Sequence, residues 1–134
     1  AYVAGADRSQ RHIYMVNADG SDPQRVTPSA SEYRFPTWSP DGSHLVFVNN
    51  QEGVGDVYSV DLGNGAYKRL TDRTSNEHHP AWSPDGTHIA VVSNRDSGRS
   101  DRFHLYVMSA NGQDMQRVSL TPVNILAKPV WRPD

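Results

Sequence analysis

One short motif returns three times along this chain, and its spacing constrains the fold more than any other feature. Residues 38–42 read WSPDG, residues 82–86 repeat the same letters 44 positions later, and residues 131–134 read WRPD. Self-similarity at such a period is typical of repeat arrays, in which copies of one supersecondary unit stack on their neighbours. We therefore expect a single repeat array over residues 1–134.

The remainder of the unit follows the same period, so the repeat is full length. An apolar residue followed by tyrosine recurs once in each copy, and an arginine follows each tyrosine after 11 residues. The tyrosines are Tyr14, Tyr58 and Tyr106, and the arginines are Arg25, Arg69 and Arg117.

Each copy contains four short strand signals separated by turn residues. Around the middle copy, residues 44–50 and 57–60 are rich in β-branched residues, Asn64-Gly65 suits a hairpin turn, and residues 69–71 and 80–82 complete the set. No segment has sustained helical periodicity, and nine Pro with ten Gly disfavour long helices. We expect an all-β fold made of antiparallel four-stranded blades, as in a β-propeller.

Three such blades fit the chain. Blade 1 is expected over about residues 1–38, blade 2 over about 36–82 and blade 3 over about 80–131. The recurring tryptophans are interpreted as core or inter-blade packing residues rather than sugar platforms, because they keep the same register in every copy. They are Trp38, Trp82 and Trp131.

Composition excludes several kinds of partner. The net charge is −2, and no block of like charges is long enough to follow a phosphate backbone, so we expect no nucleic acid partner. No apolar run approaches the roughly 20 residues of a spanning helix, and no amino-terminal signal is present, so no membrane insertion is expected. The absence of cysteine excludes disulfides and thiolate chemistry without choosing a compartment.

Three motifs in a fixed order resemble a known family. The WSPDG turn, residues 13–27 (IYMVNADGSDPQRVT) and residues 93–96 (SNRD) resemble the WD-like repeats of TolB-type six-bladed β-propellers. Similar repeats occur in the propeller domains of prolyl-oligopeptidase-like peptidases, tricorn-type proteases and oligogalacturonate lyases. The resemblance implies a periplasmic or cell-envelope setting and a lipoprotein or peptide-like partner. The chain departs from the family in its loops, mainly by about four inserted residues within 97–102 and by Arg132 in the last motif.

The phase of the repeat suggests how the array closes. Residues 1–3 align with residues 46–48, so the first blade lacks its own WSPDG strand, whereas residues 129–134 are a spare copy of it. Three blades are fewer than the four to eight of closed propellers. We therefore expect a homodimer, in which two chains form a six-bladed ring by strand exchange. The self-association residues are Tyr2, Val3, Pro129, Val130 and Trp131. The alternatives are half of a longer chain and an engineered or evolutionary half-propeller without a ligand.

The loops at one face of the array differ in sequence while the strands agree, and variable loops on a rigid scaffold usually carry function. We expect this face to bind a protein or peptide partner. The candidate partner-binding residues are Tyr33, Arg34, Phe35, Glu77, His78, His79, Arg99, Arg102 and Lys128.

The sharpest metal-ligand signal is the segment Glu77-His78-His79-Pro80, because two histidines beside a carboxylate could hold a divalent metal. Neighbouring residues of a regular strand point to opposite faces, so a third ligand has to come from elsewhere. His12, Asp56 and His104 align with one another at a loop-to-strand junction and are the possible sources. A hydrogen-bonded histidine pair is the favoured interpretation, and we assign no metal and no cofactor.

No catalytic pattern is found in the sequence. It contains no Gly-x-Ser-x-Gly elbow, no phosphate-binding loop and no His-Glu-x-x-His motif. We expect a non-enzymatic binding scaffold. The alternative is the propeller portion of a larger hydrolase or lyase, in which this segment gates substrate in the manner of a peptidase or, like an oligogalacturonate lyase, holds a metal.

Overall fold

The computed structural model describes residues 1–51, 53–72 and 74–133. In this part of the chain there are eleven short strands and one 3-10 helix, η1 (Arg8–Gln10), and no helix is long and apolar enough to cross a membrane. The strands are β1 (Tyr2–Gly5), β2 (Arg11–Met15), β3 (Gln24–Arg25), β4 (Tyr33–Trp38), β5 (His44–Gln51), β6 (Val54–Asp61), β7 (Tyr67–Arg69), β8 (Glu77–Trp82), β9 (His88–Ser93), β10 (His104–Ser109) and β11 (Gln116–Arg117).

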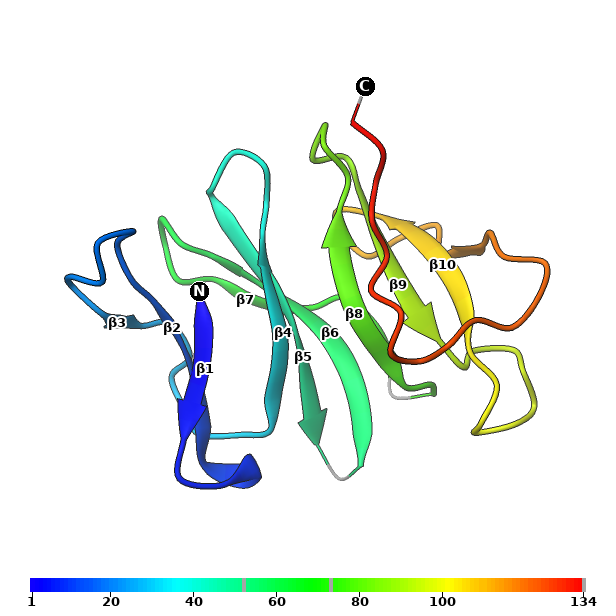
Figure 1. Cartoon of the computed structure of the whole chain (residues 1–134), viewed down its shortest axis with the longest axis horizontal. Helices are drawn as coiled ribbons and strands as arrows, with labels where there is room; N and C mark the ends of the chain where they lie inside the picture. The colour runs from blue at the N-terminus through cyan, green and yellow to red at the C-terminus, as the bar shows by residue number, and fades with distance from the viewer. Residues whose placement is uncertain (52, 73, 134) are drawn as a thin grey trace.

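The strands form three antiparallel sheets that follow one another along the chain. The first has the order β1-β2-β3, the second β4-β5-β6-β7 and the third β8-β9-β10-β11. They stand side by side, with the first strands β4 and β8 as neighbours (Figure 1). The expected all-β architecture of antiparallel blades is confirmed. No sheet closes on itself within the described residues, so strand exchange stays a prediction.

The WSPDG motif forms the turn between the first two strands of a sheet. In the first copy, Gly42 has φ +73°, a conformation that glycine adopts without a steric penalty. Asp41 accepts hydrogen bonds from the Ser39 hydroxyl (2.6 Å) and the Ser43 amide (3.0 Å), and Ser39 Oγ accepts the amide of His44 (2.9 Å). The second motif repeats these contacts with Ser83, Asp85, Thr87 and His88.

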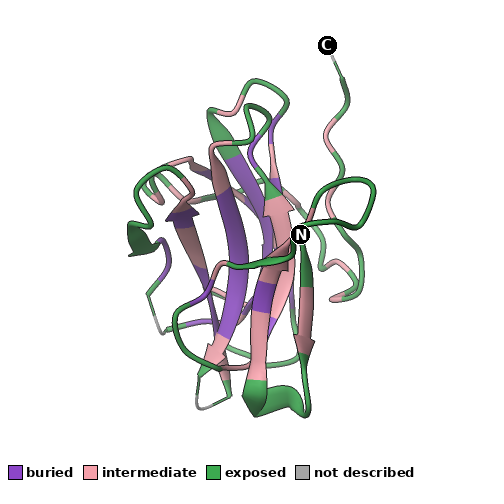
Figure 2. Ribbon diagram, turned by 90° about the vertical axis from the view of Figure 1, so that its left-hand side faces the viewer, coloured by how far each residue is buried: buried purple, intermediate pink, exposed green. Residues whose placement is uncertain are grey.

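The middle sheet is buried on both faces. Leu45 and Phe47 of β5 belong to an apolar cluster shared with the first sheet, whereas Val46 and Val48 belong to a cluster shared with the third sheet. Because successive side chains of a strand point to opposite faces, β5 contributes to both apolar clusters. Figure 2, which looks along the row of sheets, shows the buried residues mainly within strands and the exposed residues mainly in the loops.

In each sheet, a side-chain hydroxyl that follows the last strand accepts a hydrogen bond from a backbone amide of the strand before it. In the middle sheet, Thr71 Oγ1 accepts the amide of Val57 (3.0 Å) and donates to Asp56 (2.9 Å). The other sheets repeat the contact, since the amides of Ile13 and Leu105 donate to the hydroxyls of Thr27 (3.1 Å) and Ser119 (3.0 Å). This contact explains a recurring Thr or Ser two residues after each repeated arginine.

Candidate functional site

Strands β4 and β8 carry the same irregularity at repeat-equivalent positions. Each pairs with its neighbour through a register shift, a β-bulge that contains Phe35 in β4 and His79 in β8. Phe35 has φ +55° and His79 has φ +52°, values that residues with a Cβ rarely adopt. Bulges re-aim side chains and interrupt the regular alternation of a strand. The opposite orientation expected for His78 and His79 therefore does not hold here, and their rings lie 6.3 Å apart.

The bulges bring four rings together in what we call the aromatic cluster: Phe35, His78, His79 and Phe103. The rings of Phe35 and His79 are 3.9 Å apart between centroids and tilted by 31°. His78 meets Phe103 edge-on at 5.4 Å and lies 6.2 Å from Phe35. The cluster joins the second sheet to the third at the face where the long loops open.

Both histidines of the cluster are neutral at neutral pH. Burial, followed by the neighbouring His79 and Arg34, lowers the pKa of His78 to about 4. Burial also lowers the pKa of His79, with Lys128 acting in the same direction and a hydrogen bond to the Ile125 backbone opposing it. His79 Nδ1 is buried and has no hydrogen-bond partner among the described residues. The cluster therefore offers neutral rings and one unsatisfied ring nitrogen.

A metal site does not form from these histidines in the described part of the chain. No three His, Asp or Glu residues come together there as a ligand group. The possible third ligands stand at the repeated hydroxyl contacts of their own sheets: His12 Nδ1 lies 3.2 Å from Thr27 Oγ1, and His104 Nδ1 lies 3.4 Å from Ser119 Oγ. Asp56 makes the corresponding contact with Thr71, described above.

Two candidate partner-binding residues lie inside the fold. Tyr33 is 2 % exposed, donates its hydroxyl to the Ser29 carbonyl (3.1 Å) and packs edge-on against Phe47. Glu77 is completely buried, and its Oε1 accepts hydrogen bonds from Ser75 and Ser93. Burial raises the pKa of Glu77 to about 7, with the charge of Asp56 acting in the same direction. We leave Tyr33 and Glu77 out of the binding surface.

The other candidates are basic, and two of them lie near the cluster, since Arg34 acts on the charge of His78 and Lys128 on that of His79. Arg34 forms an ion pair with Glu32, and Arg99 forms a two-point pair with Asp101 at 3.0 Å. Arg102 and Lys128 are exposed and make no ion pair within the described residues. A cavity of about 260 Å³ opens beside the cluster. Its walls include Arg34, Asn50, Asn76, His78, Phe103 and Ile125.

Comparison with known proteins agrees with this architecture. The family model of the tricorn protease N-terminal β-propeller domain matches residues 8–128. The chain belongs to this propeller family. The TolB-like resemblance of its repeats is confirmed as well: the Tol-Pal system protein TolB of Xanthomonas campestris pv. campestris is 39 % identical over 69 residues. That match covers 49 % of this chain and 16 % of the relative.

Solved structures show the same blades. The crystal structure of TolB from Acinetobacter baumannii has a TM-score of 0.73 at 27 % identity, over 96 % of this propeller chain and 31 % of that one. The tricorn protease has a TM-score of 0.66 at 11 % identity, over 90 % of this chain and 16 % of the protease, and therefore shares the fold. This propeller chain spans only 16 to 31 % of the length of these three relatives.

The predicted self-association residues lie at the two ends of this row of propeller sheets (Figure 1). Tyr2 is 41 % exposed on β1 and stacks on Tyr14 at 5.5 Å, while Val3 is half-buried. At the other end, Val130 is 88 % exposed and Trp131 Nε1 donates to the carbonyl of Ala81 in β8 (3.0 Å). Residues 129–133 run beside β8 without a strand partner.

The sequence prediction missed the bulges and the participation of Phe103. A usable signal was present, because Phe35, His79 and Lys128 each precede a proline at equivalent positions of the propeller repeat. A residue before proline is excluded from the α region, so a recurring X-Pro pair inside a strand marks a local irregularity. The sequence has no comparable signal for Phe103, which lies at the end of the inserted loop and is brought to the cluster by tertiary packing.

Proposed function

We propose that this chain is a non-catalytic propeller scaffold that binds a protein or peptide partner through the aromatic cluster and its rim. The observation that carries the proposal is the repeated bulge, which holds Phe35 and His79 in a rare backbone conformation beside a surface cavity. Backbone strain kept at equivalent sites of two blades is a hallmark of functional positions. Aromatic and arginine side chains are also the types enriched in protein interfaces.

The chemistry of the surface suggests the partner. Arg102, which precedes Phe103, and Lys128 give the rim a positive charge, and the neutral rings of His78 and His79 give it an aromatic centre. We propose an extended segment with acidic and apolar residues. The likeness to a Tol-Pal system protein supports a partner of the peptide or lipoprotein kind and a periplasmic or cell-envelope setting. Because the chain spans a small part of these relatives, both statements concern this propeller segment alone.

The competing proposal is that the segment gates substrate for a larger hydrolase. Its support is the family description, which names a protease. The two proposals differ in what the isolated chain does, since a scaffold binds its partner alone, whereas a gate only restricts access to a catalytic domain.

The test is peptide selection on the immobilised 134-residue chain from a random displayed library. We expect enriched acidic and apolar peptides that bind in solution and lose at least about tenfold in affinity to the double variant Phe35→Gly, His79→Gly. Glycine tolerates the positive φ at both positions, so this variant removes two rings and keeps the backbone. Arg69→Gln, in the outer strand β7 away from the cluster and outside the walls of both cavities, is the control. Selected peptides that bind the double variant as tightly as the wild type contradict the proposal.

We further propose that two chains associate into a six-bladed ring. β1 pairs with β2 on one side only, and residues 129–133 lie beside β8 much as β8 lies beside β4. Pairing of residues 129–133 with β1 of a second copy satisfies both edges. Light scattering across a dilution series is expected to give twice the mass of one chain, and deletion of residues 130–134 is expected to abolish the dimer. A monomer at every concentration contradicts the ring and favours strands supplied by a longer chain.

A further inference from the structure

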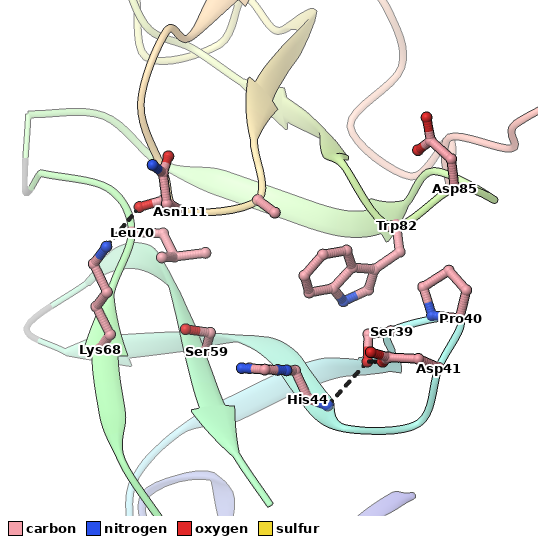
Figure 3. A pocket seen from close by; sticks show the side chains of 12 residues that line it. Ser39, Pro40, Asp41, His44, Ser59, Lys68, Leu70, Trp82, Asp85 and Asn111 are labelled. Carbon is pink, nitrogen blue, oxygen red and sulfur yellow. Dashed lines mark hydrogen bonds between the residues drawn. The ribbon is translucent and has the colours of Figure 1, made fainter.

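A second cavity lies between the second and third sheets, near the WSPDG turns and apart from the aromatic cluster (Figure 3). Its volume is about 450 Å³, within the range of small-molecule sites. The two sheets beside the cavity each have four strands, and the turn between β10 and β11 forms part of the cavity wall. Gly112 of that turn lies so near Leu70 that a Cβ there would come within 2.6 Å of the Leu70 carbonyl oxygen. The cavity is therefore held by close packing of two blades.

A cavity occurs at the equivalent place in each repeat, but the side chains that line it differ between repeats. Smaller cavities of about 380 and 130 Å³ lie beside Trp131 and Trp38, as the large one lies beside Trp82. Ser59 and Lys68 line the large cavity, and the equivalent residues of the other two are Val107 with Gln116 and Met15 with Gln24. Because the same blade forms without a hydroxyl or a cation at these places, the fold does not require Ser59 or Lys68.

The ends of the cavity carry opposite charges. Figure 3 shows Lys68 at one end and Asp41 toward the other, while the carboxylate of Asp85 lies beyond Trp82 and points away from Asp41. Lys68 Nζ donates to the Asn111 carbonyl (2.8 Å) and pairs with no acid within the described residues. Hydrogen bonds from the turn hydroxyls, Ser39 and Ser83 first, lower the pKa of Asp41 and of Asp85 to about 2, so both are ionised at neutral pH.

An indole lies between the charged ends. Trp82 packs against the apolar cluster of the second and third sheets, and its Nε1 is buried without a hydrogen-bond partner among the described residues. The equivalent Trp131 donates to a backbone carbonyl instead. The indole face attracts ammonium groups. Leu70 and Ala110 supply apolar wall on the same cavity.

We propose that this cavity binds a zwitterion whose ammonium and carboxylate groups are separated by a methylene chain, as in a lysine at the carboxyl end of a peptide. The ammonium group meets Asp41, the methylenes lie along Trp82 and Leu70, and the carboxylate meets Lys68. Charge complementarity at both ends and an aromatic wall between them recognise this class and reject ligands that carry only one charge.

The test uses 6-aminohexanoate as the probe and the indole N–H signals of the three tryptophans as the readout in two-dimensional NMR. The Trp82 signal is assigned by its loss in Trp82→Phe. We expect it to shift saturably, with an affinity at least about tenfold higher for 6-aminohexanoate than for hexylammonium or hexanoate. Shorter ω-amino acids, 4-aminobutyrate and 5-aminopentanoate, report the length that the two charged ends accept.

Three variants separate the roles of the ends. Lys68→Gln is expected to lower the affinity for 6-aminohexanoate to that of hexylammonium, and Asp41→Asn to weaken both amines about tenfold. Asp19→Asn is the matched control, because Asp19 accepts the amide and hydroxyl of Ser21 in a similar turn outside the cavity. Equal binding of the zwitterion and either singly charged ligand overturns the proposal, as does the absence of a saturable shift. The variant Phe35→Gly, His79→Gly is expected to bind the probe normally, which separates this site from the peptide-binding surface.

Discussion

Strands β4 and β8 have nearly the same backbone and very different chemistry. Both open a four-stranded sheet, both contain a bulge with a positive φ, and both end at a WSPDG turn. At equivalent positions, however, β4 has Tyr33 and Phe35 where β8 has Glu77 and His79. The repeat therefore preserves a backbone path and its turn hydrogen bonds. The side chains along that path differ between copies and serve as core residues, as a buried acid or as part of the proposed binding surface.

The largest expected difference concerns Tyr33 and Glu77, the first residues of the two strands. Tyr33→Ala removes a buried ring from the cluster with Phe47 and is expected to lower the free energy of unfolding by about 3–5 kcal/mol. Chemical denaturation measures this loss. A loss below about 1 kcal/mol would mean that the first two sheets pack without this ring. The contrast drawn between the first residues of β4 and β8 would then be wrong.

Glu77→Gln is expected to stabilise the chain at high pH. The folded state raises the pKa of Glu77 from 4.5 to about 7, so the wild type binds a proton more tightly when folded and loses stability as the pH rises from about 4.5 to 7. Glutamine keeps the hydrogen bonds to Ser75 and Ser93 without that loss. The advantage of the variant should grow with pH to on the order of 3 kcal/mol above pH 7. Parallel stability profiles of the two proteins would contradict a raised pKa.

The bulge itself is tested by glycine and alanine at Phe35 and His79. Both substitutions remove the ring, but only glycine accepts positive φ freely, so each glycine variant should be more stable than the alanine variant by about 1 kcal/mol. Thermal unfolding of the four single variants measures the differences. A difference at one position only would show that the two bulges, although equivalent in the repeat, are held by different forces.

The smallest expected effect belongs to His78, which stands where β4 has Arg34. The folded state lowers the pKa of His78 from 6.5 to about 4, so the unfolded chain takes up the proton first and stability falls as the pH drops from about 6.5 to 4. His78→Gln removes this dependence, so between pH 7 and pH 5 its melting temperature should fall less than that of the wild type, by about 3 °C. An NMR titration provides a direct check, and an imidazole that titrates near 6.5 in the folded chain contradicts the predicted burial.

Much of the fold was predictable from the repeat. The period and the recurring turn residues predicted all-β antiparallel blades, and both the sheets and the family membership confirm that interpretation. The candidate site was less accessible. The His78 and His79 pair was recognised, but the regular alternation assumed for it was wrong, because a bulge changes the direction of a strand without changing its β-branched composition. Ring formation by strand exchange and partner binding stay predictions.

The sequence by itself determined the blade: where its strands lie, how its WSPDG turns are hydrogen-bonded and why β5 is apolar on both faces. These features are local or periodic, so they are encoded within one copy of the unit. Only the tertiary structure decided which side chains of different copies come together: Phe35 meets His79, and Trp82 lines one cavity with Lys68 and Asp41. Such contacts depend on the packing of neighbouring blades, where bulges and single substitutions within an unchanged repeat select the chemistry.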